Sequence, residues 1–233
     1  MTMKTIGLLG GMTWHSTVDY YRLINEGIQR RVGGSSSARC VLYSVEFGEV
    51  EKLQEAGDWE RLTRLMVDAA LKVEGAGADL LVICANTMHR TAEAISAAVA
   101  IPLVHIADAA AEAVRKAHLK TVGLLGTRYT MEMEFYRERL EKKHDLRVLI
   151  PDEPDRTRVH DVIYTELGHG LIKDTSRAEY LAIIGRLRTR GAEGVILGCT
   201  EIPLLVKPGD AAIPLFDTTA LHAQAAVEAA LRE

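Results

Sequence analysis

A sequence pattern that occurs twice in this chain of 233 residues limits the folds available to it. Residues 5–10 read TIGLLG, and residues 121–126, 116 positions later, read TVGLLG. Three further matches follow in the same order, at offsets between 112 and 115: YYR at 20–22 with FYR at 135–137, LVIC at 81–84 with VILGC at 195–199, and IPL at 101–103 with IPL at 213–215. Four ordered matches at nearly one offset predict two copies of one structural unit.

Each copy is predicted to alternate strands with helices. Short apolar runs predict strands at 5–9, 40–45, 80–84, 103–106, 121–125, 146–150 and 194–198. Apolar residues at helical spacing predict helices at 16–31, 58–76, 92–99, 107–117, 131–142, 156–170, 176–190 and 218–231. Strands that alternate with helices form parallel sheets covered on both faces. We therefore expect an α/β fold of two similar open parallel-sheet domains, 1–117 and 118–233, related by a pseudo-two-fold axis, with the C-terminal helix able to pack against the first.

The composition excludes several classes of protein. Hydrophobic residues make up 48% of the chain, enough for a substantial core. Lys and Arg number 28 against 32 Asp and Glu, and the charges are interspersed, so neither a nucleic acid nor an anionic membrane is expected as a partner. No apolar run approaches the roughly 18 residues that span a membrane. The first 12 residues lack the features of a signal peptide.

The cysteines predict free thiols. Cys40, Cys84 and Cys199 are an odd number at wide spacing, which fits neither a disulfide framework nor a zinc site. A reducing cytoplasm is the expected location. The eight histidines show no HxxxH or HxH pattern, so no metal site is predicted.

Two of the thiols follow predicted strands that are equivalent in the repeat. Ligands of open parallel sheets bind at the carboxyl ends of the strands. Cys84 opens the stretch CANTMH, and Cys199 lies in GCTEIP. Backbone N–H groups at the start of a following helix stabilise an anion, so we expect a lowered pKa for both thiols. Cys40 lies within an apolar run and is expected to be a small buried hydrophobe.

A pair of equivalent thiols suggests a specific reaction. One thiolate can remove a proton from a substrate carbon while the opposed thiol delivers a proton to the other face, which inverts a stereocentre. A hydrolase needs one nucleophile with one oriented base, whereas a racemase needs a symmetric pair. The short polar side chains of Asn86, Thr87 and Thr200 suit the binding of a substrate carboxylate.

Four segments resemble the aspartate/glutamate racemase family, whose members racemise amino acids without pyridoxal phosphate: GGMTW at 10–14, CANTMH at 84–89, GLLGTRYTMEMEFY at 123–136 and GCTEIPLL at 198–205. The resemblance implies two α/β domains with the active site between them, Cys84 and Cys199 as the two bases, and no cofactor. It also implies that Asn86, Thr87, Thr200 and the region of Met12 line the substrate pocket. Members are commonly homodimers, and the expected substrate is a small acidic amino acid, aspartate first and glutamate second.

Other candidates carry weaker signals. Gly10 and Gly11 lack the pattern of a phosphate loop, and fit a turn that approaches the substrate. Thr127 follows the equivalent strand in the second copy, as a substrate contact or as a helix cap. His89 and Arg90 could bind the distal carboxylate of the substrate or be solvated on a helix turn. Residues 158–170 resemble a family segment near the site, in which relatives carry a Lys where this chain has Gly168 or His169.

Two alternative functions share this fold. Relatives in the wider superfamily racemise hydantoins, isomerise maleate or decarboxylate arylmalonates. A non-catalytic amino-acid-binding protein is a third class, although a binder has no need of two opposed bases. Aspartate and glutamate differ by one methylene, which is worth only about 1–3 kcal/mol in a pocket.

Overall fold

The computed structural model describes residues 3–232, which form two four-stranded sheets. The strand orders are β2-β1-β3-β4 and β6-β5-β7-β8, so they correspond strand for strand. All neighbouring strands are parallel. The prediction of an α/β fold with two similar parallel sheets is confirmed. Within the described residues, no helix has both the length and the apolar character needed to cross a bilayer.

The first sheet and the helices along its part of the chain have these bounds: β1 Ile6–Gly10, α1 Trp14–Val32, β2 Cys40–Ser44, α2 Phe47–Glu55, α3 Trp59–Gly75, β3 Leu80–Ile83, the 3₁₀ turn η1 Thr87–Thr91, α4 Ala92–Ala98 and β4 Leu103–Val104. The rest of the chain contains α5 Ile106–Lys116, β5 Thr121–Gly126, α6 Arg128–Glu132, α7 Glu134–Glu138, the π-helical turn η2 Arg139–Lys143, β6 Arg147–Leu149, α8 Asp155–Thr165, the 3₁₀ turn η3 Leu167–His169, α9 Asp174–Thr189, β7 Gly194–Gly198, α10 Ile202–Leu205, β8 Leu215–Asp217 and α11 Thr218–Leu231.

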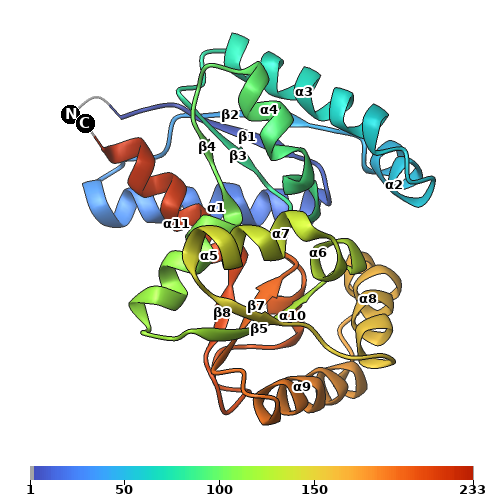
Figure 1. Ribbon diagram of the computed structural model, residues 1–233. Coiled ribbons are helices and arrows are strands. Elements are labelled where there is room, and N and C mark those ends of the chain that lie inside the picture. The colour runs from blue at the N-terminus through green and yellow to red at the C-terminus, as the bar shows by residue number, and fades with distance from the viewer. Residues whose placement is uncertain (1–2, 233) are drawn as a thin grey trace. The chain divides into compact units, whose positions relative to one another are not determined.

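The first compact unit contains the described residues up to His105 and those from His222 onward. Its sheet is covered on one face by α2, α3 and α4, whose apolar side chains pack with Leu9, Leu81 and Ile83. On the other face, α1 and α11 pack side by side against the strands (Figure 1). Because both faces are covered, the central strands β1 and β3 are completely buried, which explains why they are apolar at every position or contain glycine.

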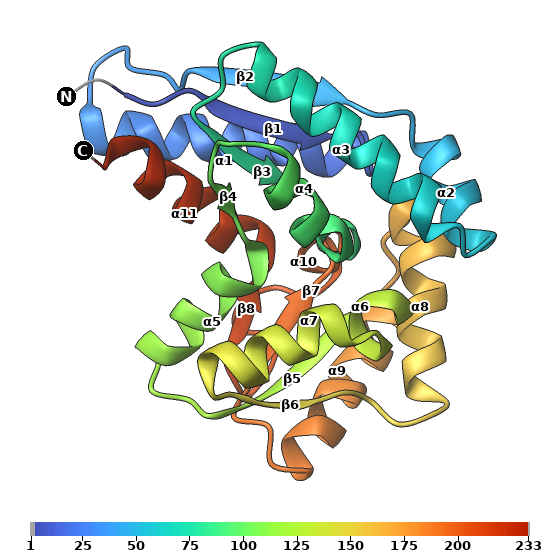
Figure 2. The same ribbon diagram turned by 45° about the horizontal axis from the view of Figure 1, so that its top comes forward.

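The second compact unit is Ile106–Leu221. Helices α8, α9 and α10 cover one face of its sheet, and α5, α7 and η2 cover the other (Figure 2). The chain therefore passes between the units at residues 105/106, before α5, whereas the repeat places the boundary after residue 117. Helix α5 belongs to this unit because its alanines and Val114 pack with Val122 and Leu124 of β5.

Charge also holds α5 in the second unit. The Asp108 carboxylate accepts two hydrogen bonds from the Arg139 guanidinium, at 2.7 and 2.8 Å, and further bonds from Lys143 and His144. Although partial burial acts in the opposite direction, these donors hold the pKa of Asp108 well below its ordinary value. An ionised carboxylate with this many donors fixes α5 against η2.

Two predicted helices differ from the structure, and one helix was not predicted. The predicted helix 131–142 is interrupted at Met133, whose extended backbone separates α6 from α7. The predicted helix 156–170 ends at Thr165 and continues as the short turn η3. Helix α2 was not predicted, and it begins where the Glu46 side chain accepts hydrogen bonds from the N–H groups of Gly48 and Glu49.

The structure shifts one of the repeat's sequence matches by a residue. Tyr20 and Tyr136, 116 positions apart, are both fully buried, whereas Tyr21 is 54% exposed. Tyr20 is therefore the counterpart of Tyr136, at the same offset as the two glycine-containing strands. Their hydroxyl groups differ: Tyr20 lies 2.8 Å from His222 Nδ1, while the Tyr136 hydroxyl has no hydrogen-bond partner among residues 3–232.

The hydrogen bonds of His222 fix its tautomer. Its Nε2 lies 2.7 Å from the Val104 carbonyl oxygen, which can only accept, so Nε2 carries the proton. In the neutral ring Nδ1 is then an acceptor, and the Tyr20 hydroxyl donates to it. Tyr20 thus satisfies a buried acceptor and links α1 to α11.

We predict opposite outcomes for the two equivalent tyrosines. Tyr20→Phe removes a buried hydrogen bond and should lower the free energy of unfolding by about 1–3 kcal/mol. Tyr136→Phe removes an unpaired buried hydroxyl and should leave it within about 0.5 kcal/mol of wild type, or raise it. Urea denaturation followed by circular dichroism measures both. Equal losses in the two variants would contradict this assignment of the hydrogen bonds.

Candidate active site

Cys84 lies immediately after the buried strand β3. Its N–H donates to the Leu9 carbonyl at 2.9 Å, which fixes the backbone at the carboxyl edge of the sheet. The side chain is 0% exposed and packs with residues of α1 and α11. The Val82 carbonyl oxygen lies 4.0 Å from Sγ, at the outer limit of a thiol hydrogen bond. The first thiol is thus held in an apolar setting.

The segment after Cys84 turns back on itself. Asn86 and Thr87 open the 3₁₀ turn η1, and both are buried, at 4% and 8% exposed. His89 closes the turn because its Nδ1 lies 2.8 Å from the Ala85 carbonyl oxygen, and it must donate to that oxygen. The His89 ring also packs edge-on against the His105 ring, with ring centroids 4.6 Å apart. His89 therefore supports the polypeptide that carries Cys84.

His89 and Arg90 each had two expected roles: binding the distal carboxylate of the substrate, or solvation on a helix turn. His89 is 2% exposed, so it is not solvated on a helix turn. The Arg90 guanidinium lies over the Trp59 ring, 4.5 Å from its centroid, in a cation–π contact.

Gly11 makes the turn after β1 possible. Its φ of +95° lies in the region that favours glycine, and its N–H donates to Thr17 Oγ1 at 2.8 Å. Met12 follows, is 6% exposed and packs into the core beneath α3. Strands β1 and β3 are neighbours with Leu9 opposite Ile83, so Met12 and Cys84 emerge at the same edge of the first sheet.

Cys199 occupies the equivalent place in the second unit. It follows β7, whose five residues are all buried, and it is itself 6% exposed. Its Sγ lies 3.0 Å from Oε2 of Glu201, to which the thiol donates. The Thr200 hydroxyl donates to the same oxygen at 2.7 Å. Thr200 and Cys199 thus share one acceptor atom.

Glu201 was not among the predicted site residues. It is 7% exposed, an unusual burial for a carboxylate unless donors surround it. The sequence signal was an acidic residue two positions after a strand-end thiol, in GCTEIP. That signal does not show which way the side chain points.

Thr127 stands at the same edge of the second sheet. Gly126 at the end of β5 is opposite Gly198 at the end of β7, so Thr127 and Cys199 follow neighbouring strand ends. Thr127 caps α6, because its hydroxyl accepts from the Thr130 N–H at 3.3 Å. The cap was one of its two expected roles. A role in substrate binding remains a prediction for Thr127, as it does for Met12, Asn86, Thr87 and Thr200.

The expectation of lowered thiol pKa values is wrong for this structure. Burial raises the pKa of Cys84 well above that of an ordinary thiol. Burial, followed by the charge and hydrogen bond of Glu201, raises the pKa of Cys199. The helices that follow are too short and too distant in sequence to reverse this: α10 begins three residues after Cys199 and has four residues. Both thiols are therefore protonated at neutral pH.

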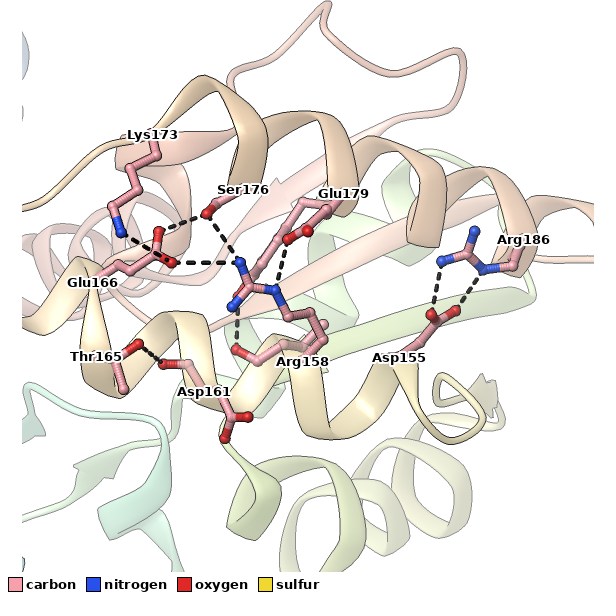
Figure 3. Close-up of polar contacts among 11 residues, drawn as sticks. Asp155, Arg158, Asp161, Thr165, Glu166, Lys173, Ser176, Glu179 and Arg186 are labelled. Carbon is pink, nitrogen blue, oxygen red and sulfur yellow. Dashed lines mark hydrogen bonds and ion pairs between the residues drawn. The ribbon is translucent and has the colours of Figure 1, made fainter.

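The segment 158–170 is part of an ion-pair network between α8 and α9 (Figure 3). Arg158 donates to Glu179 and Glu166, and Ser176 also donates to Glu166. Lys173 lies 3.5 Å from Glu166. Arg158 and Lys173 are thus both paired with carboxylates of the same unit. Neither is therefore a free substitute for the Lys that relatives carry at the position of Gly168 or His169.

The sequence profile of the Asp/Glu/Hydantoin racemase family matches residues 9–226. The chain is 50% identical to a candidate Asp/Glu racemase from Yersinia pestis of known crystal structure, with a TM-score of 0.93 over 99% of this chain and 100% of that one. An aspartate racemase homologue from Pyrococcus horikoshii is 35% identical, with a TM-score of 0.84 over the same shares. The broad specificity amino-acid racemase RacX of Bacillus subtilis is 23% identical over 95% of this chain and 96% of its own length.

We predict that the native thiols react slowly with iodoacetamide at neutral pH. Thiolate is the reactive form, and the raised pKa values keep Cys84 and Cys199 protonated. Their alkylation rates, measured by peptide mass spectrometry, should still rise about tenfold per pH unit at pH 9. The same thiols in urea-unfolded protein should level off near their ordinary pKa of about 8.5. A native rate that is flat above pH 8 would contradict the raised pKa values.

Proposed function

This chain belongs to the Asp/Glu/Hydantoin racemase family, and from that premise we propose that it interconverts L- and D-aspartate, with glutamate as the second substrate, by a two-base mechanism without a cofactor. The named relatives in this family include amino-acid racemases, which are isomerases. The observation that carries the proposal is a pair of buried thiols, one at the end of β3 and one at the end of β7, in equivalent places of two matching sheets.

In the proposed reaction the two thiols act on opposite faces of the substrate's α-carbon. The thiolate of one cysteine removes the α-proton, and the thiol of the other donates a proton to the opposite face. The product has the inverted configuration, and the two cysteines have exchanged protonation states. When the two cysteines exchange these roles, the other enantiomer is converted.

Burial of the thiols serves this chemistry. The α-proton of an amino acid is much less acidic than an ordinary thiol, so a thiolate of ordinary pKa is a weak base for it. Burial raises the pKa of Cys84 and of Cys199, which makes each thiolate a stronger base. The cost is a smaller fraction of thiolate at neutral pH.

The developing carbanion also needs hydrogen-bond donors. We assign this role to Asn86, Thr87, Thr127 and Thr200, together with backbone N–H groups near the strand ends, because each follows a strand at a carboxyl edge. Met12 is proposed as an apolar wall. We also propose that the protein is a cytoplasmic homodimer and that its ligand is a small acidic amino acid.

The names of the relatives favour aspartate over glutamate as the first substrate to test. The structural relative at 35% identity is described as an aspartate racemase homologue. The curated relative of full length is described as having broad specificity, so other amino acids belong in the same assay.

We predict that Cys84→Ala and Cys199→Ala each lower the rate of aspartate racemisation by about 100-fold or more, because each removes one of two obligatory proton carriers. Chiral chromatography of the product from either pure enantiomer measures the rate. Cys40→Ala is the matched control, since the partly buried Cys40 is the first residue of β2, at the amino edge of the sheet rather than the carboxyl edge, and should keep the wild-type rate within about twofold. Substantial activity in either of the first two variants would exclude the two-base mechanism.

A further inference from the structure

Glu201 contacts Cys199 directly, so the two thiols have different surroundings. Oε2 of Glu201 receives the Cys199 thiol at 3.0 Å and the Thr200 hydroxyl at 2.7 Å. Both donors therefore converge on one oxygen of Glu201. With Glu201 at 7% and Cys199 at 6% exposed, this contact is shielded from solvent. Charge-assisted hydrogen bonds are strongest in such a setting.

The first unit has no acidic residue at this position. The residue two places after Cys84 is Asn86, a neutral amide, whereas the residue two places after Cys199 is Glu201. Repeat-related thiols therefore have neighbours of different charge. A negative charge beside a thiol disfavours the thiolate, so Glu201 disfavours ionisation of Cys199, whereas the equivalent neighbour of Cys84 carries no charge.

We propose that Glu201 is a positioning residue that holds the proton of Cys199, so that the substrate-free protein presents Cys199 as the proton donor and Cys84 as the thiol that ionises first. The proposal rests on the racemase function proposed above and adds to it an order of protonation. Glu201 acts through Cys199 and needs no contact with the substrate.

The protons balance in a cycle that starts from this state. Cys84 gives its proton to solvent, and its thiolate then takes the α-proton from one face of the substrate. Cys199 donates its proton to the other face and becomes a thiolate beside the Glu201 carboxylate. Because two adjacent negative charges repel, this thiolate readily takes a proton from solvent, which restores the starting state of Cys199. The opposite enantiomer needs Cys199 ionised first, against the charge of Glu201.

Other ionisable groups of the same unit also act on Cys199. Tyr180 of α9 is fully buried near the thiol, and its hydroxyl donates to the Val159 carbonyl at 2.8 Å. Behind Tyr180 lie Arg158, Glu166 and Glu179, which are paired with one another. Their charges partly cancel, whereas Glu201 contacts the sulfur directly, so Glu201 is the group whose removal should change Cys199 most.

The direct test measures alkylation of Cys199 in Glu201→Gln, an isosteric variant that removes the charge and leaves one amide oxygen able to accept from the thiol. Lowering the pKa of Cys199 by about one unit makes its alkylation by iodoacetamide about tenfold faster at a fixed pH, because the thiolate fraction rises tenfold. Cys84 and Cys40, in the same protein, should change by less than about twofold. An unchanged Cys199 rate in folded Glu201→Gln would overturn the proposal.

Two further variants separate charge from shape. Glu201→Asp keeps the charge but shortens the side chain, so its Cys199 rate should lie closer to wild type than that of Glu201→Gln. If Glu201 only filled space, the isosteric Gln would behave as wild type and Asp would not, which would also overturn the proposal. Glu138→Gln is the matched control, because Glu138 is an acidic residue of the same unit that pairs with Lys142 rather than with a thiol.

The pH dependence of racemisation gives a second readout. Activity that needs Cys199 as donor is lost as the pH rises through its pKa, so this loss should occur at lower pH in Glu201→Gln than in wild type. If the wild-type protein racemises no acidic amino acid, the proposed function is refuted. The alkylation test needs no substrate, so it still shows whether Glu201 controls ionisation of Cys199. If the wild-type protein racemises aspartate but its pH profile is the same as that of Glu201→Gln, the role of Glu201 is refuted and the proposed function is not.

Discussion

Burial of a thiol at the end of a parallel strand sets the protonation behaviour of both candidate site cysteines. Strands β3 and β7 are covered by helices on both faces, so Cys84 and Cys199, which follow them, are still buried. Desolvation favours the neutral thiol and raises the pKa of Cys84 and Cys199. The same desolvation strengthens the thiolate as a base and strengthens every nearby hydrogen bond. Position, protonation and basicity therefore have one physical cause.

Duplication supplied two such positions, but the copies have diverged around them. The sheets share one strand order, and each is covered by helices on both faces. Yet Tyr20 donates to a histidine that Tyr136 lacks, and Cys199 has a carboxylate where the equivalent neighbour of Cys84 is an amide. Reversal of a stereocentre needs two proton carriers, and it does not require that their surroundings be the same. The divergence instead gives each thiol its own protonation behaviour.

The sequence predicted most strands and the edge at which the site residues lie, because apolar runs, glycine turns and the repeat are local signals. It could not predict the interruption at Met133 or the assignment of α5 to the second unit, since both depend on packing between distant segments. Glu201 was missed for a similar reason: its role depends on a side-chain direction that brings Oε2 to Cys199. The thiol pKa values were predicted with the wrong sign, because burial raises them by more than the helix N-termini lower them.

In the proposed mechanism, two thiols invert the α-carbon of an acidic amino acid without a cofactor. Proton NMR of L-aspartate, and separately of D-aspartate, with the reduced protein in D₂O tests it most directly. The two-base mechanism predicts that the α-proton signal disappears from both samples and that each comes to contain both enantiomers. Persistence of the α-proton signal in both, with aspartate and with glutamate, would contradict it.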